Sequence, residues 1–110
     1  MNQREIILVP FPFSDLNGKK VRPALILSKN KFNTENEDVL ICAITSNITP
    51  SPYTFLIDQT HLEKGNLHEK SAVKVENIAK IHKSLIIKRF AQINEKTFSE
   101  ILKKLRNVFE

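Results

Sequence analysis

The sequence lacks the residues that mark several classes of protein. Its 110 residues include one cysteine, one methionine, two glycines and no tryptophan. A single cysteine cannot form an internal disulfide, which excludes a disulfide-stabilised secreted scaffold and favours a reducing compartment. No apolar run approaches the roughly 20 residues of a membrane-spanning helix. The apolar run after Arg4 is short and ends in prolines, unlike a signal peptide. We therefore expect a cytoplasmic protein that makes no contact with a membrane.

Length and charge limit the size of the protein and the chemistry of its partners. Residues 1–110 are expected to form one domain around a single core. Seventeen Lys and Arg residues against twelve Asp and Glu give a net charge of +5, which favours an anionic partner. Five basic residues and no acidic one fall within 19–31, and five basic residues with one acid, Glu76, fall within 74–89. The two clusters would form a groove for a polyanion if they met across a small barrel. As separate solvated faces they would serve only solubility.

The stretch 9–28 has the pattern of a strand, a turn and a second strand. Pro10 and Pro12 lack backbone donors, so the first strand is expected to leave its sheet there. The dipeptide Asn17-Gly18 is typical of a tight turn. Arg22 then stands at the start of the second, apolar strand. An arginine held by its scaffold is suited to bind a phosphate, although it could instead donate to loop carbonyls.

Short apolar segments elsewhere predict a sheet of several strands. The run 39–45 is almost continuously apolar, so it is expected in the middle of the sheet. Cys42 lies in this run and is expected to be a buried core residue. Polar segments at 29–38 and 58–70 are expected to be loops, the second with a turn at Gly65-Asn66. The expected strands are 5–9, 21–28, 39–45, 53–57, 71–75, 78–81 and 85–93.

The end of the chain changes to a helical period. Apolar residues recur at helical spacing along one stripe, and basic residues occupy the opposite face. Asn94 is expected to cap the first turn, or Thr97 and Glu100 form a capping box. The stripe consists of Phe98, Ile101, Leu102, Leu105 and Val108. The sequence therefore predicts a fold of class α+β, mainly β, in which a small, strongly bent antiparallel sheet is closed by a C-terminal helix.

Several blocks of the sequence resemble a known family. They are PFPFSDL at 10–16, VRPALILS at 21–28, VLICAITS at 39–46, SAV at 71–73 leading to Ile78, and KSL at 83–85. In this order and spacing the chain resembles, from end to end, the MazF/PemK-like toxins of type II toxin–antitoxin systems.

The resemblance implies a fold, an activity and partners. The fold would be an SH3-like small barrel of the CcdB/MazF/PemK type, and the protein would form a homodimer. The activity would be that of an endoribonuclease that needs no metal or other cofactor and cleaves single-stranded RNA at selected sequences. A cognate acidic antitoxin would neutralise the toxin by folding onto its basic groove, and would bind DNA together with it.

The resemblance also assigns catalytic positions. The family's Arg-Pro arginine falls on Arg22, and its threonine after the central strand falls on Thr45. An Arg-x-Asp pair of PemK/Kid-type relatives falls on Lys74 and Glu76, which keep the charges with different side chains. Arg22 would stabilise negative charge, Thr45 would position a phosphate oxygen, Glu76 would act as base, and Lys74 would donate a proton or hold phosphate. Which group is acid and which is base stays open, because Glu76 could instead pair with Lys74 or Lys80 at the surface.

The chemistry of RNA cleavage is compatible with this set of residues. The 2′-hydroxyl of RNA can attack the adjacent phosphate, provided that a group takes its proton and another protonates the leaving 5′-oxygen. His61, His68 and His82 show no paired spacing of metal ligands, and no acidic pair has metal-site spacing. We therefore expect no metal. His82 is a second candidate, after Glu76, for the acid–base role.

Residues in and beside the loops at 11–20 and 46–53 are expected to bind RNA. Aromatic rings hold unpaired bases by stacking. Phe11 and Phe13 are equally suited to stacking and to packing in a dimer interface. The other phenylalanines that follow strand or helix periods are expected in the core, namely Phe55, Phe90, Phe98 and Phe109. The expected RNA-binding residues are Phe13, Asp15, Asn17, Lys19, Lys20, Ser46, Asn47 and Tyr53.

Two other functions are compatible with a small basic barrel. A CcdB-like inhibitor of DNA gyrase would share the fold, but CcdB toxins end in a tryptophan-containing tail and this chain has no tryptophan. A barrel that binds nucleic acid without cutting it would need only the basic clusters. It would bind RNA in a salt-sensitive way and leave it intact.

Overall fold

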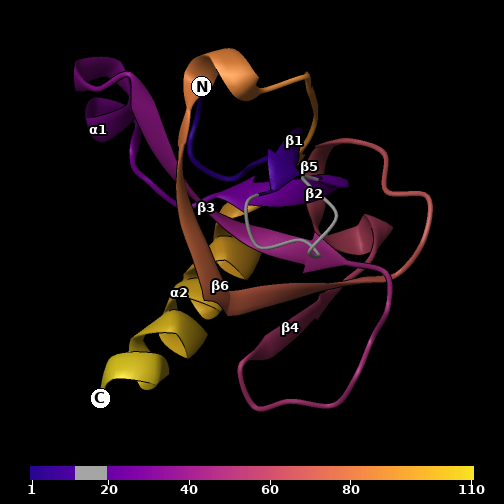
Figure 1. The fold of residues 1–110 in the computed structure, drawn as a ribbon. Coiled ribbons are helices and arrows are strands. Elements are labelled where there is room, and N and C mark those ends of the chain that lie inside the picture. Colours follow the sequence, from indigo (N-terminus) through magenta and orange to yellow (C-terminus); the bar gives the residue numbers. More distant parts are fainter. Residues whose placement is uncertain (12–19) are drawn as a thin grey trace.

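The structure, a computed structural model, describes residues 1–11 and 20–110. Within these residues seven strands form one antiparallel sheet in the order β4-β6-β3-β2-β1-β7-β5 (Figure 1). The strands are β1 (Glu5–Phe11), β2 (Lys20–Ile26), β3 (Asp38–Thr45), β4 (Thr54–Ile57), β5 (Leu62–Gly65), β6 (Ser71–His82) and β7 (Lys88–Ile93). The helices are α1 (Asn30–Glu35) and α2 (Glu95–Phe109), with short 3₁₀ helices η1 (Gln59–His61) and η2 (Lys83–Leu85). The turn expected at Asn17-Gly18 lies outside the described residues.

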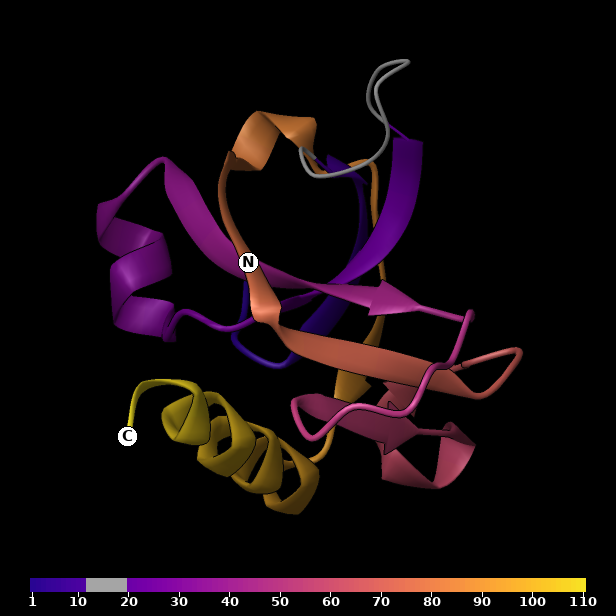
Figure 2. The same ribbon diagram turned by 60° about the horizontal axis from the view of Figure 1, so that its bottom comes forward.

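The sheet is strongly curled, and α2 packs against it (Figure 2). The bend is sharpest in β6, which continues through both of the strands expected at 71–75 and 78–81. Next to β3 its register jumps from Cys42↔Ile78 to Ala43↔Lys74, so residues 75–77 of β6 have no partner on β3. Such an irregularity bends a strand and redirects its side chains. The predicted class, a strongly bent antiparallel sheet closed by a C-terminal helix, is confirmed.

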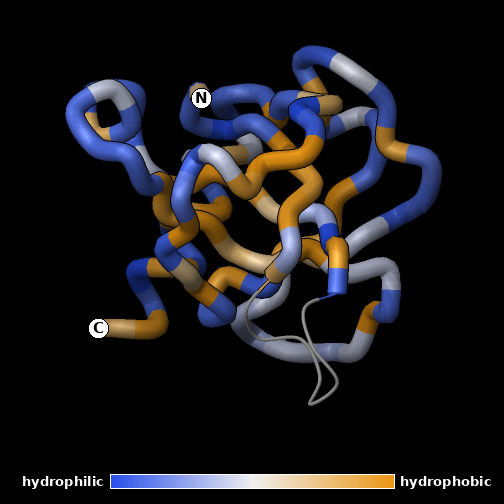
Figure 3. The backbone as a smooth tube through the Cα atoms, turned by 45° about the horizontal axis from the view of Figure 1, so that its top comes forward, coloured by the Kyte–Doolittle hydropathy of each residue, from blue (hydrophilic) through white to orange (hydrophobic). Residues whose placement is uncertain are grey.

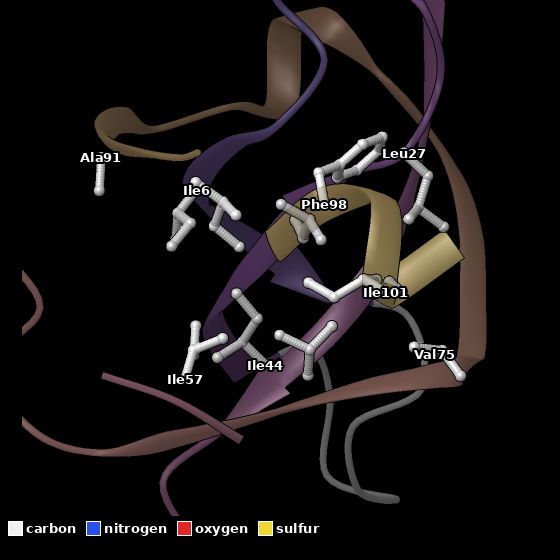
Figure 4. Packing of buried hydrophobic residues seen from close by; sticks show 12 residues of the cluster. Ile6, Leu27, Ile44, Ile57, Val75, Ala91, Phe98 and Ile101 are labelled. Carbon is white, nitrogen blue, oxygen red and sulfur yellow. The ribbon is translucent and has the colours of Figure 1, made fainter. Parts of the chain in front are cut away.

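Both faces of the central strands are buried, in two clusters rather than the single core expected. One cluster lies between the sheet and α2, where Ile6, Ile44 and Val75 surround Phe98 and Ile101 of the helix (Figure 4). The other lies on the opposite face of β1, β2 and β3 and contains Ile7, Val9, Phe11, Ala24, Ile26, Val39, Ile41 and Ala43. A strand buried on both faces needs apolar residues at consecutive positions. This explains the unbroken apolar run of β3, which lies inside the sheet as predicted.

The C-terminal helix begins where its cap predicts. The side chain of Asn94 accepts a hydrogen bond of 2.8 Å from the backbone N–H of Thr97, which confirms the first of the two capping alternatives. Phe98 and Ile101 are buried by the sheet. Phe109, expected in the core, is 74% exposed because the last turn of the helix extends past the sheet.

The first two strands differ from expectation at their ends. β2 runs from Lys20 to Ile26 instead of over 21–28. β1 continues through Pro10 to Phe11, and Pro10 pairs with Val21. The pairing of β1 with β7 ends at Leu8. Beyond Leu8, β1 therefore has a described partner strand only on its β2 side, where a proline is tolerated as it is on an edge strand.

Two segments expected to be loops contain regular structure. The segment 29–38 contains α1, which is held by the side chain of Asn33; its amide donates to the carbonyl oxygens of Ser28 at 2.9 Å and Met1 at 3.1 Å. The segment 58–70 contains η1 and β5, and β5 ends at the expected Gly65 turn. Both helices are short and mostly polar, so neither shows an apolar period from which it could be predicted.

Apolar segments run through the middle of the molecule, and polar segments form its outer loops (Figure 3). Cys42 is fully buried, as expected. Burial raises the pKa of its thiol, and the nearby charge of Glu76 raises the pKa further. The thiol is therefore an inert core group. No helix in the described part of the chain is long and apolar enough to cross a membrane.

Candidate functional site

The strand register brings three of the expected catalytic residues to one face of the sheet. Ala24 on β2 and Ala43 on β3 form the last pair of these two strands, and Arg22 and Thr45 each lie two residues beyond it. Ala43 also pairs with Lys74 on β6. Paired residues share a face, and so do residues two apart on one strand. Arg22, Thr45 and Lys74 thus belong to the face of the second apolar cluster, at the end where that cluster stops.

These three residues line a pocket of about 260 Å³, here called the Arg22 pocket. Asn47, predicted to bind RNA, also lines it. Thr49 and Asn77 complete its polar wall and were not predicted. Asn77 could not be placed from the sequence because it follows Lys74 by three residues, which breaks the two-residue period of a strand. The bend in β6 at 75–77 brings it to the pocket.

Arg22 carries a buried polar atom without a partner in the part of the chain that the structure describes. Its Nε makes no hydrogen bond with any residue of 1–11 or 20–110. No carboxylate among the described residues forms an ion pair with Arg22, whereas Arg4 pairs with Glu63 and Arg89 with Glu5. A buried donor left unsatisfied costs about 1–3 kcal/mol, so its presence calls for an explanation. An anion in the pocket would accept from it.

Thr45 ends β3, and its hydroxyl is partly engaged. The oxygen Oγ1 accepts a hydrogen bond of 3.1 Å from the backbone N–H of Asn47, which turns the chain out of the sheet. A hydroxyl has one proton to donate besides the lone pairs that accept. The proton of Thr45 therefore remains able to donate to a ligand oxygen in the pocket.

Lys74 and Glu76, expected to act together, are separated by the bend in β6. Lys74 is half-buried and lines the pocket, while Glu76 is exposed and does not line it. The surface pairing considered for Glu76 is not found in the described part of the chain either: Lys80 instead pairs with Asp38, at 3.9 Å. Regular strand alternation would have put both on one face, and the register jump prevents this.

A second pocket, of about 360 Å³ and here called the His68 pocket, adjoins the first. Arg22 and Thr45 line both pockets. Lys20 and Ser46, both predicted to bind RNA, line the second. Three other polar residues, from the turn before β6 and from the first position of that strand, were not predicted as site residues; they are His68, Glu69 and Ser71. The pairing of Thr45 with Ala72 explains their position, because it places the start of β6 beside the end of β3.

A third pocket, of about 550 Å³ and here called the Lys88 pocket, continues from the second. His68 and Phe90 line both. Lys88 and Arg89 line the third, with Asn66 and Leu8. Members of the two basic clusters of the sequence therefore lie along one series of adjoining pockets, as a polyanion groove requires.

Other expected site residues lie apart from these pockets or cannot be placed. Tyr53 is 39% exposed and lines none of the three. Phe11 lines the Arg22 pocket but is only 1% exposed, so its ring is not free to stack on a base. Phe13, Asp15, Asn17 and Lys19 lie outside the described residues.

The three histidines have different surroundings. His61 caps η1, since its Nδ1 accepts from the backbone N–H of Asp58 at 2.9 Å. His82 lies 3.2 Å from Glu37 and 2.8 Å from the Ser84 hydroxyl, and lines none of the three pockets. His82, the second candidate for the acid–base role, therefore shares none of these three pockets with Arg22. Among the described residues, no three His, Cys, Asp or Glu side chains cluster as a metal site would require.

Comparison with known proteins gives the family and the fold. Residues 2–109 match the family model described as PemK-like, MazF-like toxin of type II toxin–antitoxin system. Among curated protein sequences, none matches this chain. A similar solved structure is a mycobacterial endoribonuclease in complex with its cognate antitoxin, with 17% identity, a TM-score of 0.78, and coverage of 97% of this chain and 92% of that one.

Two further solved structures have the same fold. The toxin MazF-mt6 of Mycobacterium tuberculosis is 19% identical, with a TM-score of 0.77 and coverage of 96% of each chain. MazF of Deinococcus radiodurans is 18% identical, with a TM-score of 0.75 and coverage of 98% of this chain and 94% of that one. The expected MazF-type barrel is confirmed. Because the family model extends over nearly the whole chain, this protein belongs to the PemK-like, MazF-like toxins of type II toxin–antitoxin systems.

Proposed function

We propose that this toxin is an endoribonuclease that cleaves single-stranded RNA at selected sequences, by attack of the 2′-hydroxyl on the adjacent phosphate and without a metal. The observation that carries the proposal is the buried Nε of Arg22, which lacks a partner among the described residues and lies in a small pocket with Thr45 and Lys74. A guanidinium that has no carboxylate partner in the described chain is a ready site for a phosphodiester. The pocket offers donors and cations, the groups that stabilise a phosphate as its charge increases.

Each residue of the Arg22 pocket has a role in this reaction. Arg22 binds the nonbridging oxygens and stabilises the additional negative charge of the five-coordinate phosphorus. Thr45 donates its hydroxyl proton to one of these oxygens and so fixes the phosphate. Lys74 protonates the leaving 5′-oxygen. Glu76 lies outside the pocket, so it is not assigned to the proton transfer.

Sequence selectivity is assigned to the amides and hydroxyls around the phosphate site. Asn47 and Asn77 each present a donor and an acceptor to the Arg22 pocket. RNA-binding proteins read unpaired bases through hydrogen bonds to their edges. Ser46 and Lys20 in the His68 pocket would contact the neighbouring nucleotide.

One experiment tests the activity. Purified protein incubated with an RNA of mixed sequence in EDTA should yield fragments with 2′,3′-cyclic phosphate and 5′-hydroxyl ends, which end-mapping identifies. Thr45→Ala should reduce the rate about 100-fold, the usual effect of losing one donor to a developing oxyanion. Thr34→Ala, at an exposed position on α1, is the matched control and should cleave normally. Salt-sensitive binding with intact RNA would instead identify a barrel that binds without cutting.

The antitoxin of this toxin is proposed to be acidic and to cover the same pockets. The solved structure of an endoribonuclease in complex with its cognate antitoxin has a similar fold. In this chain Lys20, Arg22, Lys74 and Lys88 line the three adjoining pockets and would attract an acidic segment. We place toxin and antitoxin in the cytoplasm, where mRNA would be the substrate and the Cys42 thiol stays reduced.

A homodimer is proposed from exposed apolar side chains near β1. Val21 is 53% exposed and pairs with Pro10, and Ile87 is 60% exposed with its backbone N–H bonded to the carbonyl of Leu8 at 2.9 Å. Ile87→Asp should convert the dimer to a monomer in light scattering, because a charge at the centre of an apolar interface lacks a partner. Leu56→Asp, equally exposed at 54% on β4, is the control and should remain dimeric. A monomeric wild-type protein would contradict the proposal.

A further inference from the structure

Through its described residues, the Arg22 pocket offers a proton donor for RNA cleavage but no proton acceptor. Cleavage requires one group to take the proton of the 2′-hydroxyl and another to protonate the leaving 5′-oxygen. Of the described residues lining this pocket, only Arg22 and Lys74 carry titratable side chains, and both residue types are ordinarily cationic. Arginine does not release its proton in proteins. Within the described part of the chain, an acceptor is therefore to be sought elsewhere in the groove.

The His68 pocket adjoins the position at which Arg22 and Thr45 would hold a phosphate. Arg22 and Thr45 line both pockets, so a phosphodiester bound to them has room for a nucleotide on each side. The attacking and leaving oxygens of an in-line displacement lie on opposite sides of phosphorus. A donor in one pocket therefore requires its acceptor in the other. Of the described residues of the His68 pocket, His68 and Glu69 are of the types that serve as general bases in catalysis.

The backbone of the turn that carries His68 is held in place. Gln59 forms a clamp around it: its side-chain Nε2 donates to the carbonyl of Gly65 at 3.0 Å, and its Oε1 accepts from the backbone N–H of Leu67 at 2.8 Å. On the other side of His68, the hydroxyl of Ser71 donates to the carbonyl of Glu69 at 3.2 Å. Because the backbone of this turn is fixed, the exposed side chain of His68 stays beside the groove and is accessible to substrate.

His68 is also the histidine that the fold does not use. His61 is engaged as a helix cap and His82 with Glu37. His68 has no hydrogen bond or ion pair with any described residue, and it lines both the His68 pocket and the Lys88 pocket. Imidazole is the side chain best matched to general-base work near neutral pH, because an efficient base titrates close to the operating pH.

We propose that His68 is the general base of the cleavage and faces the nucleotide on the 5′ side of the cut; this rests on the proposed endoribonuclease function. Neutral His68 takes the proton of the 2′-hydroxyl as its oxygen bonds to phosphorus. The bond from phosphorus to the 5′-oxygen breaks, and Lys74 gives that oxygen a proton from the opposite pocket. The products are a 2′,3′-cyclic phosphate and a 5′-hydroxyl, and the imidazolium and the neutral amine return to their starting states through solvent.

A pH profile is the first readout. The wild-type rate should fall as the pH is lowered through the range in which imidazole gains a proton, because only the neutral ring accepts one. The charged groups facing His68 are Lys20 and Arg22 from β2, Glu69 from its own turn, and Lys88 and Arg89 from β7. His68→Gln should cut about 100-fold more slowly at the plateau and lose this acid limb. His82→Gln, outside the three pockets, is the matched control and should keep both rate and profile.

A modified substrate separates base from acid. An RNA with sulfur in place of the 5′-bridging oxygen expels a thiolate, which leaves without needing a proton. On it, Lys74→Ala should regain most of its lost rate and His68→Gln should not. Recovery of His68→Gln instead, or loss of the acid limb in Glu69→Gln rather than in His68→Gln, overturns the proposal. If wild type cuts RNA and His68→Gln matches it in rate and profile, His68 is not the base but the nuclease stands; if wild type does not cut, both proposals fall.

Discussion

Arg22→Ala should abolish RNA cleavage, with a fall in rate of at least about 1,000-fold, and should leave the protein no less stable. The guanidinium is the principal charge opposite the phosphate in the proposed reaction, so its loss removes the largest electrostatic term. Its buried Nε has no hydrogen-bond partner among the residues that the structure describes. Removing that donor relieves a penalty of about 1–3 kcal/mol, which offsets the packing lost with the side chain. Cleavage assays together with urea unfolding check both parts.

Two further variants sharpen this test. Arg22→Lys keeps the charge but loses the planar pair of donors, so it should recover only a small part of the rate. Arg106→Ala removes an exposed arginine of α2 and serves as control for net charge, with unchanged cleavage expected. Normal cleavage by Arg22→Ala would remove the basis of the proposed site. A large loss of stability would mean that Arg22 is a structural residue.

Gly65→Ala should be the most destabilising of the single substitutions proposed, by at least about 3 kcal/mol. Gly65 ends β5 with a φ of +82°, a backbone conformation that residues other than glycine rarely adopt. An added Cβ would lie 2.2 Å from the carbonyl oxygen of Phe90 and 2.6 Å from the Cα of Ala91. Both neighbours are on β7, so the added methyl would push β5 away from the sheet. The free energy of unfolding in urea measures the effect.

Lys64→Ala, one residue earlier on the same strand and exposed, is the control for Gly65→Ala. It should change stability by less than about 0.5 kcal/mol, as expected of an exposed surface position. Gly65 also adjoins the turn that carries His68, so any folded Gly65→Ala protein should cleave RNA more slowly than the control. If Gly65→Ala and the wild-type protein have the same urea midpoint of unfolding, β7 moves aside for the methyl group without loss of stability. The close approach of Gly65 to β7 is then not a constraint.

The sequence by itself determined the parts of the fold that depend on local periodicity. The unbroken apolar run of β3 requires burial on both faces, and that strand lies inside the sheet. The apolar stripe predicted α2, and Asn94, the first of the two capping alternatives, is the residue that caps its start. Arg22 was predicted from its place at the start of an apolar strand, whereas Thr45 was assigned by the resemblance to the toxin family; the structure puts both on the lining of one pocket.

Only the tertiary structure decided which residues share the site with Arg22. Strand alternation puts Lys74 and Glu76 together, but the register jump in β6 turns Asn77 into the pocket and leaves Glu76 outside it. His68 stands in a polar segment without period, and it reaches the groove because the pairing of β6 with β3 brings its turn beside Thr45. A bend and a strand pairing depend on contacts between residues far apart in the chain, so no local pattern encodes them.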